Sequence, residues 1–190
     1  MGQYRYWKVL FDCVLSIFLI ILFLPLLFIL FIITSLDTKS NGIFCQKRIG
    51  QFGKTFTIYK FKTINDNKRE SSAIGLLLRR FKLDELPQLF NILKCEMSFV
   101  GPRPDIEGYY DKLKGDSRKI LDLKPGLTSE ASIKYSDEDA LLKQQKDPLF
   151  YNDEILFPDK VRMNLDYLEN MSFGNDIKIL SKTIFKVFIK

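Results

Sequence analysis

Residues 9–33 read VLFDCVLSIFLIILFLPLLFILFII, an apolar run on which the architecture of the whole chain depends. The run contains one charge, Asp12, and one proline, Pro25. About 20 apolar residues suffice to span a bilayer, and no small-residue cleavage site follows, so the run predicts a membrane anchor and not a secretory signal. The more polar chain behind it is long enough for one compact domain.

Two arrangements of this anchor are compatible with its residues. Pro25 removes a backbone donor, so a kink or a break is expected there. A single kinked helix that spans the bilayer is the commoner arrangement. Basic residues flank the run on both sides, however, and the positive-inside rule then favours both ends on the cytoplasmic side, as in a re-entrant hairpin that enters one leaflet. Asp12 needs a partner in either case, and Lys8, four residues earlier on the same helix face, could be that partner.

The composition narrows the classes of function. The net charge is +6 and there is no histidine, which excludes Ser-His-Asp and Cys-His triads and histidine-ligated metals. A basic surface suits anionic lipids, phosphorylated substrates or nucleic acid. The cysteines Cys13, Cys45 and Cys95 stand far apart, which predicts reduced, buried thiols and neither a disulfide framework nor a zinc site.

After a polar connector at 34–42, the apolar pattern predicts a mostly helical α+β domain. Two β-rich runs at 42–48 and 55–62 surround Gly50 and Gly53, which indicates a β-hairpin. Helical runs are expected at 71–81, 83–93, 106–121 and 153–168, the last interrupted at Pro158, and a turn is expected at 98–104.

The segment 176–190 predicts a basic amphipathic helix. Its lysines recur every four residues, at Lys178, Lys182, Lys186 and Lys190, and therefore share one face, while an apolar face lies beside them. Such a helix is typical of a membrane surface. An ordinary terminal helix docked on the domain, with its lysines in water, is the alternative.

Candidate chemistry lies in residues 79–91, which read RRFKLDELPQLFN. The adjacent carboxylates Asp84 and Glu85 open a predicted helix, because Pro87 is tolerated only in a first turn. The positive end of the helix dipole would lower the pKa of Asp84 and attract phosphate. An Asp at a helix start is also a common N-cap with no chemical role, so these residues alone leave both interpretations open.

Several sequence blocks together resemble a known family. They are QKRIG at 46–50, YKFKT at 59–63, LDELPQL at 83–89, MSFVGPRP at 97–104, KPGLT at 124–128 and DIKIL at 176–180. In this order they are similar to bacterial sugar transferases, the monotopic phosphoglycosyl transferases that start surface-glycan assembly on a polyprenol phosphate. The resemblance extends from Lys8 to the C-terminus. It departs from the family pattern at Leu24, where a serine is frequent, at 80–83 and at 127–129.

This resemblance implies the transfer of a phospho-sugar from a UDP-sugar to undecaprenyl phosphate, with release of UMP. Asp84 would attack the phosphorus next to the sugar and form an aspartyl-phosphosugar intermediate, and Glu85 would help to hold Mg²⁺. Arg79 and Arg103 would contact phosphate or nucleotide, and Pro102 and Pro104 would fix Arg103 between them. Substrate-binding or scaffold roles fall on Lys60 and Lys62. Pro25 becomes the break of a re-entrant hairpin.

The resemblance also implies how the chain is organised. Residues 1–36 would form the membrane hairpin, and residues 37–190 a cytosolic catalytic domain with an interfacial C-terminal helix, at the cytoplasmic face of the bacterial inner membrane. The expected partners are a UDP-sugar, undecaprenyl phosphate and membrane lipids, without nucleic acid. The oligomeric state stays open, with a homodimer as one arrangement, as do the sugar and the glycan pathway. The alternative function is a non-catalytic, membrane-anchored binding or adaptor protein.

Overall fold

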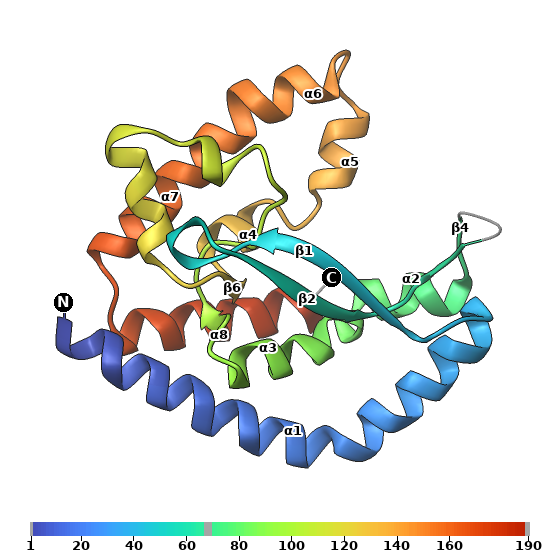
Figure 1. Ribbon diagram of the computed structural model, residues 1–190. Helices are drawn as coiled ribbons and strands as arrows, with labels where there is room; N and C mark the ends of the chain where they lie inside the picture. The colour runs from blue at the N-terminus through green and yellow to red at the C-terminus, as the bar shows by residue number, and fades with distance from the viewer. Residues whose placement is uncertain (1, 67–69, 189–190) are drawn as a thin grey trace.

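The computed structural model describes residues 2–66 and 70–188 of the 190-residue chain (Figure 1). Their fold is mostly helical with three two-stranded sheets, which confirms the predicted α+β class. The elements in chain order are α1 (Gly2–Thr38), β1 (Ile43–Ile49), η1 (Gln51–Gly53), β2 (Thr55–Phe61), β3 (Ile64–Asn65), β4 (Glu70–Ser71), α2 (Ala73–Arg80), η2 (Leu83–Gln88), α3 (Leu89–Leu93), β5 (Ser98–Val100), η3 (Tyr110–Lys112), η4 (Gly115–Asp122), β6 (Gly126–Thr128), α4 (Glu130–Lys134), α5 (Glu138–Lys143), α6 (Pro148–Tyr151), η5 (Asn152–Leu156), α7 (Phe157–Glu169) and α8 (Phe173–Phe188).

Helix α1 contains the whole apolar run and continues through Pro25. It is long and apolar enough to cross a membrane. The helix bends near its middle (Figure 1), so the expected kink is present, but the helical path has no gap at the proline. It also extends to Thr38 and replaces most of the predicted connector. The hydroxyl groups of Thr34 and Thr38 donate to carbonyls one turn back, which suits continued helix.

Helix α1 presents one face to the rest of the chain and the other to the outside. The buried face includes Lys8, Asp12, Ser16, Leu27, Leu30, Thr34 and Thr38, on both sides of Pro25. The exposed face is apolar and includes Val14, Phe18, Ile21, Leu22, Leu24, Phe28 and Ile29. Near the C-terminal end, the Ser72 hydroxyl of the α2 N-cap donates to Asp37 at 2.6 Å. Both halves of the helix therefore pack on the same domain.

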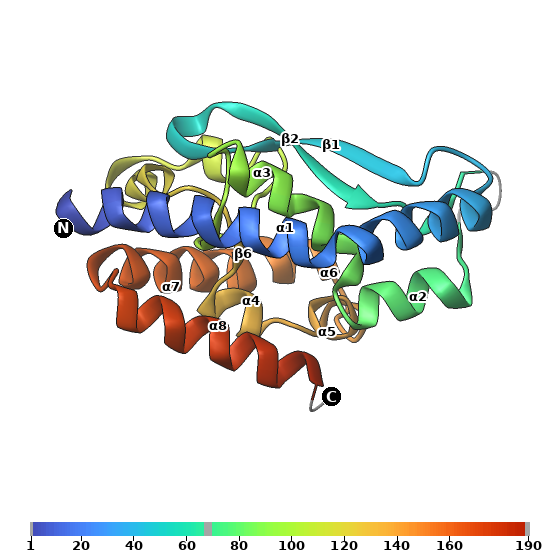
Figure 2. The same cartoon turned by 90° about the horizontal axis from the view of Figure 1, so that it is seen from below.

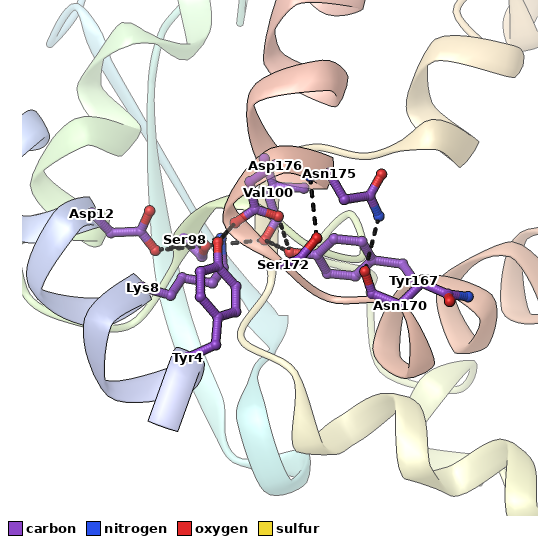
Figure 3. A network of polar contacts seen from close by, with 10 residues as sticks. All are labelled: Tyr4, Lys8, Asp12, Ser98, Val100, Tyr167, Asn170, Ser172, Asn175 and Asp176. Atoms are coloured by element: carbon purple, nitrogen blue, oxygen red, sulfur yellow. Dashed lines mark hydrogen bonds and ion pairs between the residues drawn. The ribbon is translucent and has the colours of Figure 1, made fainter. Parts of the chain in front are cut away.

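A buried polar network joins the N-terminal end of α1 to α8 (Figure 3). The Lys8 ammonium lies 2.5 Å from an Asp176 carboxylate oxygen and 3.8 Å from one of Asp12. The hydroxyl group of Ser98 donates to Asp12 at 2.7 Å. The predicted Lys8–Asp12 pair is thus present, but Asp176 is the nearer partner. We call this network the N-terminal clasp; its members are Tyr4, Lys8, Asp12, Ser98, Tyr167 and Asp176.

The predicted β-hairpin is confirmed. Strands β1 and β2 pair antiparallel, in a register from Ile43 opposite Phe61 to Ile49 opposite Thr55. The side chain of Asn91 in α3 forms hydrogen bonds with β2 of the hairpin. Its Nδ2 group donates to the Thr57 carbonyl at 2.7 Å, and its Oδ1 atom accepts from the Tyr59 backbone N–H at 3.1 Å.

A parallel pairing of β5 with β6 replaces the start of the turn expected at 98–104. It brings Gly101 against Gly126 so closely that a Cβ on Gly126 would overlap the backbone of Gly101. A Cβ on Gly101 would likewise overlap the Lys124 carbonyl. Only glycine fits at both positions. This contact fixes the loop that begins at Gly101, which contains Arg103.

Other predicted elements need correction. The helix expected at 106–121 is instead two short 3₁₀ segments, η3 and η4, because Gly108 and Gly115 have positive φ values of 107° and 57° that end a helical path. Pro158 does not interrupt its helix, since it lies in the first turn of α7, after the π-helical turn η5.

Helix α8 shows features of both predicted arrangements. Ile179 is fully buried in the core, and the Lys182 ammonium pairs with Glu130 of α4 at 2.7 Å, so the helix docks on the domain. Ile184 and Phe185 remain 59% and 64% exposed. Helices α1, α8 and α2 all lie toward the same side of the molecule (Figures 1 and 2). Lys190 lies outside the described residues.

The cysteines differ from the prediction in their exposure. Cys45 and Cys95 are exposed and Cys13 is half-buried, although all are free thiols as expected. The sulfur atoms of Cys13 and Cys95 lie 3.4 Å apart.

Candidate active site

The Asp84–Glu85 pair lies in the 3₁₀ helix η2, which follows α2 through a left-handed turn at Lys82 with a φ of 57°. The two carboxylates are 7% and 6% exposed. Pro87 falls inside this short helix, so the predicted α-helix begins only afterwards, at Leu89. Charged side chains are rarely buried unless they are paired or have a function, and the partners of these two carboxylates therefore decide their roles.

Glu85 is surrounded by positive charge. One of its carboxylate oxygens accepts from the Arg103 guanidinium at 2.6 Å and from the Lys60 ammonium at 2.9 Å. Burial by itself would raise the pKa of Glu85, but Arg103, Lys60 and Lys82 outweigh burial and bring this pKa far below its ordinary value. Glu85 is therefore a permanent anion that orients two cations.

Asp84 has the opposite environment. Its Oδ1 atom is buried and has no hydrogen-bond partner among the described residues. Burial, followed by the negative charge of Glu85, raises the pKa of Asp84 above its ordinary value. The prediction that a helix terminus lowers this pKa is wrong, because burial outweighs any such dipole. A carboxylate with an unsatisfied oxygen is poorly stabilised, and this favours its reaction with an electrophile.

A cavity of about 470 Å³ lies close to the acidic pair, although neither Asp84 nor Glu85 is among the residues that line its wall. Lys60 and Arg103 connect the cavity to the pair, since both line its wall and both contact Glu85. Cations from four separate parts of the chain line the wall: Arg48, Lys60, Lys82, Arg103 and Lys160. Hydroxyl groups and carboxylates line it as well, including Ser129, Ser132, Tyr135 and Glu138. This mixture suits a polar ligand with a strongly anionic part.

The structure brings together some of the predicted site residues. Lys60, Arg103 and Pro104 line the cavity. Pro102 is buried behind it, and its carbonyl accepts from the Gly126 backbone N–H at 2.8 Å, so this proline positions the loop.

Arg79 and Lys62, like the acidic pair, are not among the residues that line the cavity. Arg79 is exposed on α2 and donates to the Thr63 hydroxyl at 2.8 Å. The Lys62 ammonium contacts Asp66 and Ser40, and neither of these belongs to the acidic pair. For Lys62 this geometry favours the scaffold role over phosphate binding.

Sequence reasoning missed Arg48 and Lys82 as residues of the cavity. Arg48 belongs to the QKRIG block and Lys82 to the cations before the acidic pair, so both were within recognised motifs. Their positions in these blocks could have marked both residues as candidates for the site. That Arg48 lies near Arg103, however, is evident only from the folded hairpin.

The donor groups at the acidic pair fit a magnesium ion that arrives with its substrate. Among the described residues no group of three or more His, Cys, Asp or Glu side chains forms a ready-made metal site. Mg²⁺ needs only one or two protein carboxylates when phosphate oxygens and water complete its shell. The unpartnered Asp84 oxygen beside Glu85 agrees with such a sparse donor set.

This constellation defines a class of protein with a cation-lined cavity, suited to an anionic ligand, together with an apolar helix suited to a membrane. Comparison with known proteins makes the assignment specific. Residues 3–190 match the family described as bacterial sugar transferase, and the chain belongs to that family.

Individual relatives agree with this assignment. The chain is 31% identical to the uncharacterized sugar transferase EpsL of Bacillus subtilis (strain 168), over 96% of this chain and 87% of that protein. It is 32% identical to the UDP-glucose:undecaprenyl-phosphate glucose-1-phosphate transferase of Klebsiella pneumoniae, over 94% of this chain and 39% of that protein. It is 28% identical to the UDP-N-acetylgalactosamine-undecaprenyl-phosphate N-acetylgalactosaminephosphotransferase of Aeromonas hydrophila, over 91% of this chain and 41% of that protein. The chain thus spans less than half of these two longer relatives.

Proposed function

We propose that the protein transfers a sugar phosphate from a UDP-sugar to undecaprenyl phosphate, releases UMP and thereby starts the assembly of a surface glycan. The environment of Asp84 is the observation on which this proposal rests: a buried carboxylate with an unpartnered oxygen and a raised pKa, beside a cavity lined with cations. The printed activities of the Klebsiella and Aeromonas relatives, which use UDP-sugars and undecaprenyl phosphate, support the substrate class.

The proposed reaction has two displacements. A carboxylate oxygen of Asp84 attacks the phosphorus bonded to the sugar, and the bond from that phosphorus to the bridging oxygen breaks. The electron pair leaves with UMP, and an aspartyl-phosphosugar remains. An oxygen of undecaprenyl phosphate then attacks the same phosphorus, which releases Asp84 and forms the polyprenyl-diphospho-sugar. Carboxylates serve as phosphoryl acceptors in other enzymes, and Asp84 needs no histidine base because it reacts as an anion.

The other site residues divide the remaining tasks. Glu85 stays ionised and orients Arg103 and Lys60, whose positive charges offset the charge of the transferred phosphate. Glu85 would also hold Mg²⁺ together with phosphate oxygens of the substrate. When it is bound, Mg²⁺ polarises the phosphorus and offsets the charge of the diphosphate.

The proposed location is the cytoplasmic face of the bacterial inner membrane, with α1 re-entrant in one leaflet. The packing of both halves of α1 on one domain supports the re-entrant arrangement, because a helix that crossed the bilayer would leave one half on the far side. Helices α1, α2 and α8, which lie toward one side of the molecule (Figure 2), all have exposed apolar side chains that could contact lipid, in line with an interfacial C-terminal helix. The division at residues 1–36 and 37–190 remains a prediction, although α1 itself ends at Thr38.

UMP release from a panel of UDP-sugars, with and without undecaprenyl phosphate, tests this function. We expect one or a few donors to give UMP, and mass spectrometry without the lipid to detect a sugar-phosphate adduct on Asp84. The matched control is Asp116→Asn, since Asp116 is an exposed aspartate whose side chain is 91% accessible. If Asp84→Asn released UMP as well as Asp116→Asn, the covalent role of Asp84 would be wrong. If the wild-type protein released no UMP from any donor, a non-catalytic membrane-anchored binding or adaptor role would replace the proposed enzyme.

A further inference from the structure

Arg48 lines the cavity and has no role in the reaction described above. It is the second-last residue of β1 and is half-buried. Its Nη2 group donates to the Gln46 side chain at 2.7 Å. Its Nε atom is shielded from solvent and has no hydrogen-bond partner among the described residues. An unsatisfied buried donor destabilises the folded protein, so its presence in a residue that lines a cavity needs a reason.

The position of Arg48 relative to Arg103 is fixed by the backbone. The N–H of Ile49, the next residue along β1, donates to the Asp105 carbonyl at 2.9 Å, and Asp105 follows Arg103 and Pro104 in the same loop. The hairpin and the Arg103 loop are therefore bonded directly to each other. Both guanidinium groups line one cavity from these two segments.

The charges of the two arginines are balanced differently. Arg103 forms a salt bridge with Glu85 at 2.6 Å. Arg48 has no salt bridge within 4 Å among the residues that the structure describes, although Asp105 is close enough to favour its charged form. Burial lowers the pKa of Arg48, and the positive charge of Arg103 lowers it further. Arg103 has a contacting carboxylate, whereas Asp105 lies near Arg48 without a salt bridge to it, and this arrangement leaves the Arg48 guanidinium able to contact an anionic ligand.

We infer that Arg48 binds the phosphate that stays on the nucleoside, the group that departs as UMP. This inference rests on the proposed function. Lys60 and Arg103 contact the acidic pair and therefore suit the reacting phosphorus, whereas Arg48 lies along the same wall without contacting the pair. Negative charge grows on the bridging oxygen as its bond to the reacting phosphorus breaks, and a guanidinium stabilises this charge without giving up a proton.

The test compares UMP with uridine as inhibitors of UDP-sugar turnover by the full chain in lipid vesicles. UMP has the phosphate that Arg48 would contact, and uridine lacks it. We expect Arg48→Gln to weaken UMP inhibition about 10-fold or more while uridine inhibition stays unchanged, since the variant loses a charge-assisted contact that only UMP makes. The UMP inhibition constant of Arg48→Lys should fall between those of the wild type and Arg48→Gln, because an ammonium keeps the charge but cannot make a bidentate contact.

The matched control is Arg162→Gln, because Arg162 is an exposed arginine of α7 paired with Asp159. Arg162→Gln should leave both inhibition constants unchanged. If Arg48→Gln weakened UMP and uridine equally, or neither, the phosphate assignment would be wrong. Arg48→Lys gives the same decision should the glutamine variant fail to fold. If the wild-type protein releases UMP but the Arg48 variants keep the wild-type ratio of UMP to uridine inhibition constants, only this inference is overturned. If the wild-type protein releases no UMP from any donor, the proposed function itself is overturned.

Discussion

At the level of single residues, the two adjacent carboxylates lie in environments that shift their pKa values in opposite directions. Glu85 is ionised because Arg103 and Lys60 contact it, and Asp84 is destabilised as an anion because burial and Glu85 both act against its charge. Neighbouring side chains with separated pKa values can perform different chemical tasks, which is the reason for assigning attack to one and positioning to the other.

Asp84→Asn should abolish activity without a loss of stability. The raised pKa of Asp84 means that the folded state binds a proton more tightly than the unfolded state, so the ionised side chain makes the protein less stable as pH rises above the unfolded pKa. Asparagine cannot ionise, and at neutral pH the variant should melt at the same or a higher temperature. UMP release should fall by at least about 10³-fold, as expected when a nucleophile is removed. A variant that melts well below the wild type would contradict this account of the Asp84 environment.

Glu85→Gln should have the opposite effect on stability. It leaves Lys60 and Arg103 without their carboxylate, at a cost of about 1–3 kcal/mol at neutral pH. The pKa of Glu85 is depressed, so its contribution is fully present above the ordinary pKa of 4.5 and is lost as pH falls from there toward the lower folded pKa. Thermal melts of wild type and variant at pH 7 and near pH 4 measure this, and the difference should shrink at the acidic pH. If the melting temperatures of wild type and variant differed by the same amount at both pH values, repacking and not charge would cause the loss of stability.

At the level of elements, the contact between β5 and β6 determines where Arg103 lies. Gly126→Ala should destabilise the protein by at least about 1–3 kcal/mol, because the added methyl group meets the backbone of Gly101 and no flexible side chain can yield. It should also lower UMP release by moving the Arg103 loop. The matched control is Gly174→Ala in α8, where an added Cβ meets nothing within 4 Å. Equal melting temperatures for the two alanine variants would refute the close approach.

The same elements show what local patterns could and could not predict. The β1–β2 hairpin was predictable, because alternating β-rich runs and its glycines are local signals. The helix expected at 106–121 was wrong, because its apolar spacing is present but Gly108 and Gly115 adopt conformations that end it. The β5–β6 pair escaped prediction because its two strands are three residues each and pair across a separation of 28 positions between Ser98 and Gly126.

The candidate site was predictable to the extent that sequence blocks named its residues. Asp84, Glu85, Lys60 and Arg103 came from these blocks, and the structure brings them together. The environment of Asp84 was not predictable, since its pKa depends on burial by distant parts of the chain and the local helix rule gave the wrong direction. Arg48 was unrecognised for the same reason.

At the level of the whole molecule, the packing of α1 makes a prediction about topology. Single cysteines at Gln3 and Ser40, introduced after the native cysteines are replaced by serine, should react with a membrane-impermeant thiol reagent from the same side. Both ends of α1 contact one domain, through the N-terminal clasp and through the Asp37–Ser72 hydrogen bond, so they share its compartment. Labelling in intact and in opened cells distinguishes the sides. Opposite reactivity of the two cysteines would establish a spanning helix.

The N-terminal clasp also bears on how this protein is made. Lys8 leaves the ribosome 168 residues before Asp176, the carboxylate nearest to its ammonium in the finished fold. Until then the Lys8 ammonium has only Asp12 as an ion-pair partner among the residues that the structure describes, and charges of this kind resist transfer into hydrocarbon. The contacts that hold the start of α1 on the domain are therefore completed only after the chain has been synthesised as far as the last helix.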